Sequence, residues 1–219
     1  MDKSTLDYLA KLKKNNSKAW FEDNRALYNT AKEDFAAFIE DLIKETAKFD
    51  PGVKGLSPKD CMFRINRDVR FSKDKSPYKT EFGAHIQAGG RKALGGGYFI
   101  RVGPGGHTGV AGGMHGCESK HLNKIRAAID EDSKPLKKIL NAAAFKRELG
   151  ELKGEKLKTA PKGYPKDHPD LELLQFKDYF VWKAFADKDV LAAKFVKDAA
   201  KIFKLVHPLN RYLTQVVTA

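Results

Sequence analysis

The sequence predicts an α+β fold: a strongly curved, mainly antiparallel sheet of about five or more strands, flanked by N- and C-terminal helices. Apolar residues recur at helical spacing in the first 50 residues and again after Ser119. Between these two regions the apolar pattern changes to a period of two, which is typical of strands. Short glycine-rich connections separate most of these strands, so we expect sequence neighbours to pair as an antiparallel meander.

Three helices are predicted in the N-terminal region. The first follows a segment that resembles a capping box, Ser4–Asp7, and ends at Asn15 and Asn16. The second begins at Ser17, whose hydroxyl is suited to capping it. The third is the longest, near Arg25 to Lys48, and has one apolar face. The residues that we expect this face to bury are Tyr28, Phe35, Phe38, Ile39, Leu42 and Ile43.

The middle and the end of the chain predict the strands and the remaining helices. A polar loop, Ser72–Pro77, is expected after the first strand. Further helices are expected after Ser119, from Pro135, over Phe145–Leu152, at Leu171–Leu174, and from Asp187, with a kink or restart at Pro208. The expected strands are Phe63–Phe71, Phe82–Ala88, Tyr98–Val102, Thr108–Met114 and Tyr179–Phe185.

Length and composition favour one soluble domain over residues 1–219. No low-complexity linker divides the chain, and a hydrophobic content of 42% supplies enough material for a core. No run of about 18 apolar residues is present, so we expect no membrane span and no membrane partner. The start of the chain lacks a signal-peptide pattern, and its two cysteines, Cys61 and Cys117, suit a reducing compartment. We therefore expect a cytoplasmic location.

The net charge of +13 is concentrated in the middle and C-terminal parts of the chain. Residues 51–118 carry 11 basic and 5 acidic side chains, and residues 119–219 carry 21 and 13. Such an excess attracts polyanions, so nucleic acid is one possible partner. Scattered lysines on helices are also typical of an ordinary solvated surface.

The densest group of charged residues lies between Arg64 and Tyr78. If the chain is extended there, Arg64, Asn66, Asp68 and Arg70 share one face. Asp68 can then pair with either neighbouring arginine and leave the other for a ligand. Arginine donors of this kind suit phosphate or carboxylate groups. The pattern predicts a site for an anion, or else a structural network of ion pairs.

Three further residues complete this predicted site. Arg67 falls on the apolar side of the strand, so it is the arginine most in need of a protein partner. Lys75 lies in the polar loop and Tyr78 follows it, and both could fold back over the charged face. If the protein is an enzyme, Tyr78 or Asp68 is the candidate group for proton transfer. The predicted ligand-binding residues are Arg64, Arg67, Arg70, Lys75 and Tyr78.

A family resemblance rests on this same segment. The pattern is Arg64-x-x-Arg67-Asp68-x-Arg70-Phe71-x-x-x-Lys75-x-x-Tyr78. Outside it, the matching positions are Asn15, Asn16, Trp20, Phe21, Asn24, Tyr28 and Ala160–Tyr164. Together they resemble a widespread bacterial and fungal family, domain of unknown function family 2461. The resemblance covers essentially the whole chain and marks the segment as a unit, but it implies no activity.

Other motifs predict little chemistry. Glycines at Gly103–Gly106 and Gly109–Gly116 can approach a phosphate, but in antiparallel strands they more often mark curvature. No Walker loop, dinucleotide fingerprint or nucleophile elbow is present, and we predict no cofactor. The spacing of His115, Cys117 and His121 matches no common zinc site, so we predict no metal.

These observations support one working hypothesis and two alternatives. The hypothesis is a cytoplasmic protein whose arginine-rich pocket binds an anionic or phosphate-bearing small ligand, with or without catalysis. The first alternative is a nucleic-acid-binding protein that uses its basic surface. The second is that the charged cluster is only a structural ion-pair network.

Overall fold

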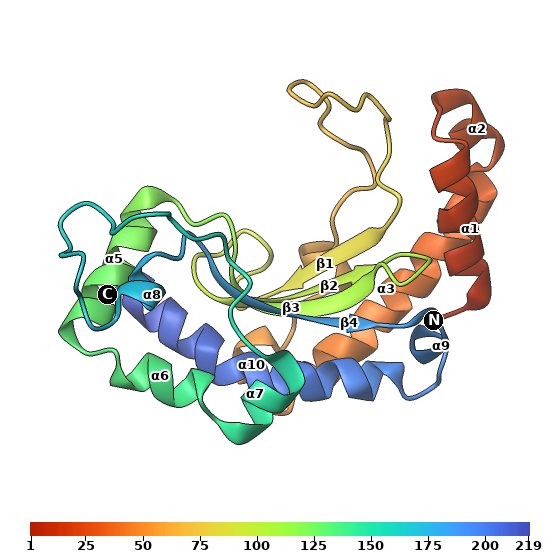
Figure 1. The fold of residues 1–219 in the computed structure, drawn as a ribbon. Helices are drawn as coiled ribbons and strands as arrows, with labels where there is room; N and C mark the ends of the chain where they lie inside the picture. The colour runs from red at the N-terminus through yellow and green to blue at the C-terminus, as the bar shows by residue number, and fades with distance from the viewer. The chain divides into compact units, whose positions relative to one another are not determined.

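The structure is a computed structural model that describes all 219 residues, and it confirms the α+β class (Figure 1). The sheet is open, antiparallel and four-stranded, with its strands in the order β1-β2-β3-β4. Strands that follow one another in sequence are therefore neighbours in the sheet. Their bounds are β1 (Phe82–Ile86), β2 (Gly97–Val102), β3 (Thr108–Met114) and β4 (Tyr179–Phe185).

Helices precede and follow this sheet in the chain, as the sequence predicts. Pro208 lies inside the last helix, which continues through it, so no new helix begins there. The helices before the sheet are α1 (Lys3–Lys14), α2 (Lys18–Asp23), α3 (Arg25–Ala47), the 3-10 helix η1 (Pro51–Val53) and α4 (Pro58–Cys61). Those after it are α5 (Ser119–Glu131), α6 (Lys134–Leu140), α7 (Ala143–Leu149), α8 (Leu171–Leu174), α9 (Asp187–Val190) and α10 (Phe195–Thr218).

The prediction of five or more strands is wrong, because Phe63–Phe71 does not form a strand. Residues 62–71 make only two isolated antiparallel bridges, Met62 with Ala84 and Asn66 with Tyr78. The period-two pattern was real, but this segment buries no continuous apolar face. Of its apolar odd-numbered residues only Ile65 is fully buried, whereas Phe63 is 39% exposed and Phe71 is 96% exposed.

The chain forms two compact units, and each is described by itself. The prediction of a single domain over residues 1–219 stays a prediction. Unit 1 comprises Met1–Lys92, Phe99–Val110 and Ala184–Lys201, and unit 2 comprises Ala93–Tyr98, Ala111–Lys183 and Ile202–Ala219.

In unit 1, α3 packs one apolar face against β1. The rings of Phe35 and Phe82 stack with their centroids 5.3 Å apart. The helix satisfies the predicted amphipathic pattern except at Tyr28, which is half-buried. Its fully buried residues are Ala31, Phe35, Phe38, Ile39, Leu42, Ile43 and Thr46. Burial of these side chains supplies much of the hydrophobic stabilisation of the unit.

In unit 2, the glycines of β3 allow α10 to approach closely. A Cβ added at Gly112 would lie 2.0 Å from Cγ1 of Val206, which no native contact tolerates. The N–H of Gly113 donates to Oδ1 of Asn210 at 2.7 Å. These glycines therefore leave room for α10 to pack closely against β3.

Candidate functional site

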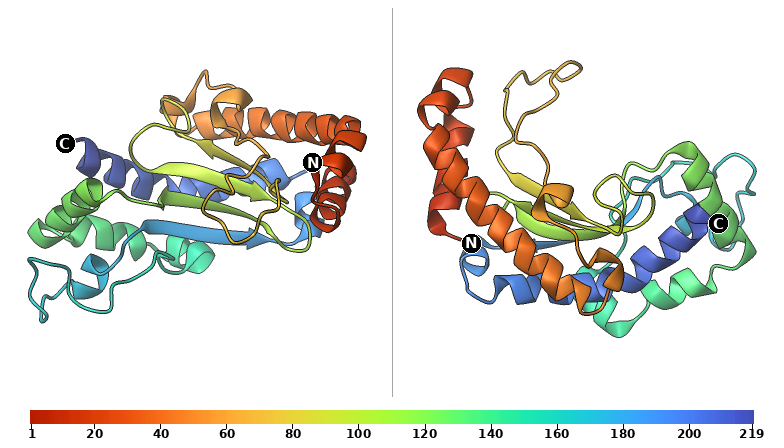
Figure 2. Two further views of the ribbon diagram at one scale, coloured as in Figure 1. Left: turned by 90° about the horizontal axis from the view of Figure 1, so that it is seen from above. Right: turned by 180° about the vertical axis from the view of Figure 1, so that it is seen from behind.

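The residues that the sequence singled out lie on one projecting loop of unit 1, residues 62–81, which we call the arm. It leaves α4 and returns to β1, and in Figures 1 and 2 its end stands clear of the other ribbons of the unit. The bridge between Asn66 and Tyr78 closes its base. This bridge consists of two hydrogen bonds, from Arg67 N to Pro77 O at 2.9 Å and from Lys79 N to Ile65 O at 2.8 Å.

Arg67 holds the two sides of the arm together. Its Nη1 donates to Oδ2 of Asp74 and, at 3.2 Å, to the carbonyl of Ser76. Its Nη2 donates to the hydroxyl of Ser72 at 3.3 Å. The side chain is only 24% exposed. Arg67 thus has protein partners that order the loop, which is the role expected of the arginine on the apolar side.

Asp74 is the acceptor at the centre of this loop. One of its oxygens accepts hydrogen bonds from the hydroxyl and the N–H of Ser76, at 2.6 and 2.8 Å. These two bonds and the contact with Arg67, in that order, lower the pKa of Asp74 to about 2. The carboxylate is therefore charged at any physiological pH and behaves as a structural acceptor.

Asp68 and Arg70 form a second pair on the arm. Nε and Nη2 of Arg70 donate to the two carboxylate oxygens of Asp68, at 2.9 and 2.7 Å. The side chains are 47% and 76% exposed, respectively, so the pair lies in solvent. Hydrogen bonding to Arg70 lowers the pKa of Asp68. A charged carboxylate with both oxygens engaged is poorly prepared to transfer a proton.

The remaining basic side chains of the arm are more available. Lys75 Nζ donates to the carbonyl of Val69 at 3.0 Å and is otherwise exposed. Arg64 is exposed, and its side chain forms no hydrogen bond or ion pair. Lys73 is exposed as well. The side chains of Arg64 and Lys73 form no hydrogen bond or ion pair, and Lys75 keeps donors beyond its bond to Val69, so all three can meet an anionic partner.

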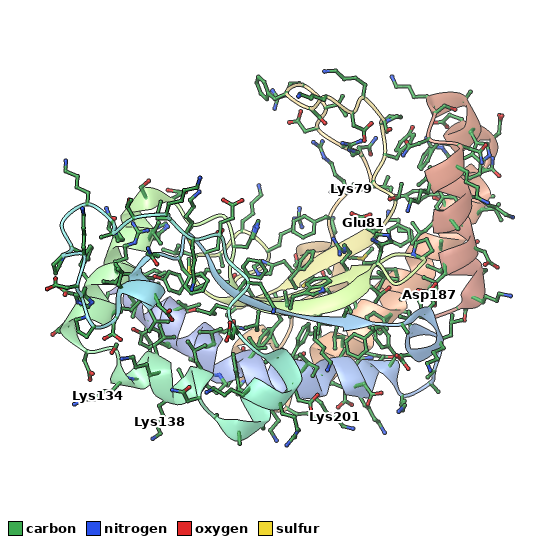
Figure 3. All side chains as sticks on the ribbon, viewed as in Figure 1. Lys79, Glu81, Lys134, Lys138, Asp187 and Lys201 are labelled. Carbon is green, nitrogen blue, oxygen red and sulfur yellow. The ribbon has the colours of Figure 1, made fainter.

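Lys79 is a residue that the sequence analysis did not select. Figure 3 shows it with Glu81 where the arm joins β1. Its Nζ donates to the carbonyl of Arg64 at 2.9 Å and lies 5.5 Å from the ring centroid of Phe63. Burial and then the charge of Arg64 lower the pKa of Lys79. Its position within the arm gave no periodic signal that could have identified it.

Phe71 at the end of the arm is the most exposed large apolar residue of the protein. It is 96% exposed, and the guanidinium carbon of Arg70 lies 5.8 Å from its ring centroid. A fully exposed phenylalanine lacks the hydrophobic stabilisation of about 1.5–3 kcal/mol that burial of its side chain would give. A single exposed apolar side chain is not unusual, but this one has cations on both sides in sequence, Arg70 and Lys73.

Tyr78 lies apart from these exposed side chains, inside the base of the arm. It is only 5% exposed, and its ring stacks on Phe21 with centroids 4.0 Å apart. The side-chain amide of Asn16 pairs with its backbone in both directions, accepting from Tyr78 N at 3.1 Å and donating to Tyr78 O at 2.9 Å. The six predicted site residues therefore divide into an exposed group and a buried tyrosine, with Arg67 between them.

The buried tyrosine belongs to an aromatic cluster that joins α1, α2, α3 and the arm. Phe21 lies 4.9 Å from Tyr28, and Tyr8 lies 6.0 Å from Trp20 and 6.1 Å from Tyr28, between ring centroids. Of the positions that carried the family resemblance near the start of the chain, Asn16 and Phe21 contact Tyr78, and Trp20 and Tyr28 belong to the same cluster. The sequence marked these residues but not their convergence, because they are far apart along the chain.

The glycine amides that might have cradled a phosphate already have acceptors. The N–H groups of Gly105 and Gly106 donate to the two oxygens of Asp187, at 2.8 and 2.9 Å, and Figure 3 labels this aspartate. In unit 2, Oδ1 of Asp178 accepts from Gly116 and Cys117. Both amide groups are therefore satisfied within the protein.

Fold and site together define an α+β protein with a projecting, basic, aromatic-tipped arm. The chain belongs to the family described as conserved hypothetical protein (DUF2461), whose model matches residues 4–212. This match confirms the family resemblance of the sequence, and the family description assigns no function. Comparison with curated proteins and with solved structures gave no match. None of the helices has the length and apolar character needed to cross a bilayer.

Proposed function

We propose that the protein binds single-stranded nucleic acid through the arm. The observation that carries the proposal is the 96% exposed ring of Phe71, with Arg70 beside it and free cations near it in sequence. Proteins that bind single strands combine basic side chains for the phosphates with aromatic rings on which bases stack. Lys73 and Lys75 supply the first element and Phe71 the second.

This proposal fits the arm better than the small-ligand hypothesis. Arg67 and Arg70 already hold the carboxylates of Asp74 and Asp68, so neither is an empty fork for a small anion. The cations without a carboxylate partner, Arg64, Lys73 and Lys75, are exposed on a projecting loop, where they can contact successive phosphates of a polymer. A small phosphate-bearing ligand held by Arg64, Arg67 and Arg70 stays the alternative, and it requires these internal pairs to open.

The test is fluorescence anisotropy with a labelled single-stranded 20-mer, as DNA and as RNA. Stacking of one base contributes about 1–3 kcal/mol, so Phe71→Ala should weaken binding about 5- to 150-fold. The matched control is Leu191→Ala, which removes an exposed apolar side chain (38% exposed) elsewhere in unit 1 and should leave affinity unchanged.

Salt dependence gives an independent readout of the phosphate contacts. For single strands, log affinity falls with log salt with a slope of about −0.7 for each phosphate neutralised. The double variant Lys73→Ala/Lys75→Ala should therefore reduce the steepness by about 1.4. Equal affinity of the wild type and Phe71→Ala would refute the proposal. Full competition by an equal concentration of a nucleoside monophosphate would favour the small-ligand alternative.

A further inference from the structure

The hydroxyl of Tyr8, in the aromatic cluster at the base of the arm, has no hydrogen-bond partner. Tyr8 is only 3% exposed, and its oxygen is shielded from solvent. A buried hydroxyl without a partner costs about 1–3 kcal/mol, and native proteins rarely leave one in that state. This position therefore calls for a bound group that the protein itself does not supply.

Hydrogen-bond donors from two other elements, α3 and the arm, lie in the same cluster as this hydroxyl. The ring of Tyr28 on α3 lies 6.1 Å from that of Tyr8, between centroids, and the ring of Tyr78 on the arm joins the same cluster through Phe21, which contacts both Tyr28 and Tyr78. Arg25, at the start of α3, lies with its guanidinium carbon 5.5 Å from the ring centroid of Phe21 in this cluster. Its Nε and Nη2 are bound to Glu22, at 2.8 and 2.6 Å, which leaves Nη1 without a partner.

The protonation states make these groups donors. Burial is the largest cause that raises the pKa of both Tyr8 and Tyr28, so both phenols keep their protons at neutral pH. The carboxylate that contacts these residues is that of Glu22, and it is already paired with Arg25. A cation would find no free acceptor charge here, whereas a negatively charged oxygen would find phenol and guanidinium donors.

We propose that Tyr8, Tyr28, Tyr78 and Arg25 form a binding site for a small oxyanion, a phosphate or carboxylate group, at the base of the arm. The anion would accept hydrogen bonds from the phenols and from Nη1 of Arg25, and so would satisfy the Tyr8 hydroxyl. The side chain of Arg25 is 54% exposed, so an anion can meet it from solvent. The site is separate from the nucleic-acid proposal, because Phe71, Lys73 and Lys75 take no part in it.

Isothermal titration calorimetry with inorganic phosphate, and separately with acetate, tests the site at constant ionic strength. We expect saturable one-to-one binding of at least one anion by the wild type. Tyr8→Phe keeps the ring and removes only the hydroxyl, so it should weaken that binding about tenfold or more. The two titrations decide whether the site prefers a phosphate or a carboxylate. Phe71→Ala should bind the anion as the wild type does.

The matched control is Tyr212→Phe, which removes the other buried tyrosine hydroxyl without a partner, in unit 2. It should leave anion binding unchanged. If the wild type binds neither phosphate nor acetate saturably, the hydroxyl meets only water and the inference is wrong. Equal anion affinity in the wild type and Tyr8→Phe would overturn it as well. A thermal melt of each variant, recorded without added anion, checks that it is folded.

Discussion

Replacement of Asn16 by alanine should loosen the arm from the helices beneath it. The amide of Asn16 makes two hydrogen bonds with the backbone of Tyr78, at 2.9 and 3.1 Å, across 62 residues of sequence. Asn16→Ala leaves a buried residue with an unpaired N–H and an unpaired carbonyl. At about 1 kcal/mol for each lost bond, the free energy of unfolding should fall by about 2 kcal/mol.

Two assays measure this loss. For a protein of this size, about 2 kcal/mol corresponds to a fall in Tm of about 4–8 °C in calorimetry. In native-state hydrogen exchange, the amide of Tyr78 should exchange about 30-fold faster, because about 1.4 kcal/mol is a factor of ten. The matched control is Asn15→Ala, whose amide bonds only to Lys11 O within its own helix. It should lower Tm by no more than about 2 °C.

Two results with these variants would contradict the anchoring role of Asn16. Equal Tm values for Asn16→Ala and Asn15→Ala would mean that the amide of Asn16 does not anchor the arm. Unchanged exchange at Tyr78 in Asn16→Ala would mean that another group, or water, protects that N–H. Either result would mean that the base of the arm is not held in place by Asn16.

Three further predictions test other parts of the structure. The pKa of Asp74 is lowered from 3.8 to about 2, so its stabilisation of the loop is complete above pH 4 and is lost as the pH falls through about 2. Amide hydrogen exchange of the loop, recorded as a function of pH, should show this loss, and Asp74→Asn should abolish the pH dependence. Gly113→Ala brings a Cβ within 2.1 Å of a backbone carbonyl oxygen and should lower the free energy of unfolding, measured with denaturant, by more than about 3 kcal/mol. The Cβ of the control variant Gly116→Ala meets open space, so that variant should lower it by only about 1–2 kcal/mol. Burial raises the pKa of Cys61 and of Cys117 to about 11, so iodoacetamide at pH 8 should label neither thiol until the protein is unfolded.

Helices and paired strands could be predicted from the sequence because they bury one face. The stripe on α3 and the alternation of the strand at Phe82 both place apolar side chains in a core, and both elements form. At Phe63–Phe71 the same alternation appears without a core to receive it, so the segment becomes an arm. A period of two shows that a chain can present two faces, but it does not show that another element covers one of them.

The candidate site was predictable in its residues but not in its geometry. The charge density and the family pattern both identified the segment from Arg64 to Tyr78. They could not show that Arg67 pairs with Asp74, because that contact depends on the turn between them. Nor could they show that Tyr78 turns inward against Phe21, since the packing of distant aromatic residues leaves no mark in local periodicity.

The central claim is that the tip of the arm contacts a nucleic-acid base. Ultraviolet crosslinking of the wild-type protein to a single-stranded oligonucleotide, followed by mass spectrometry of the digested complex, tests this contact directly. A base stacked on Phe71 should crosslink to the peptide that contains it, and Phe71→Ala should abolish that crosslink. Crosslinks confined to peptides outside residues 62–81, or none at concentrations that saturate binding, would contradict the claim.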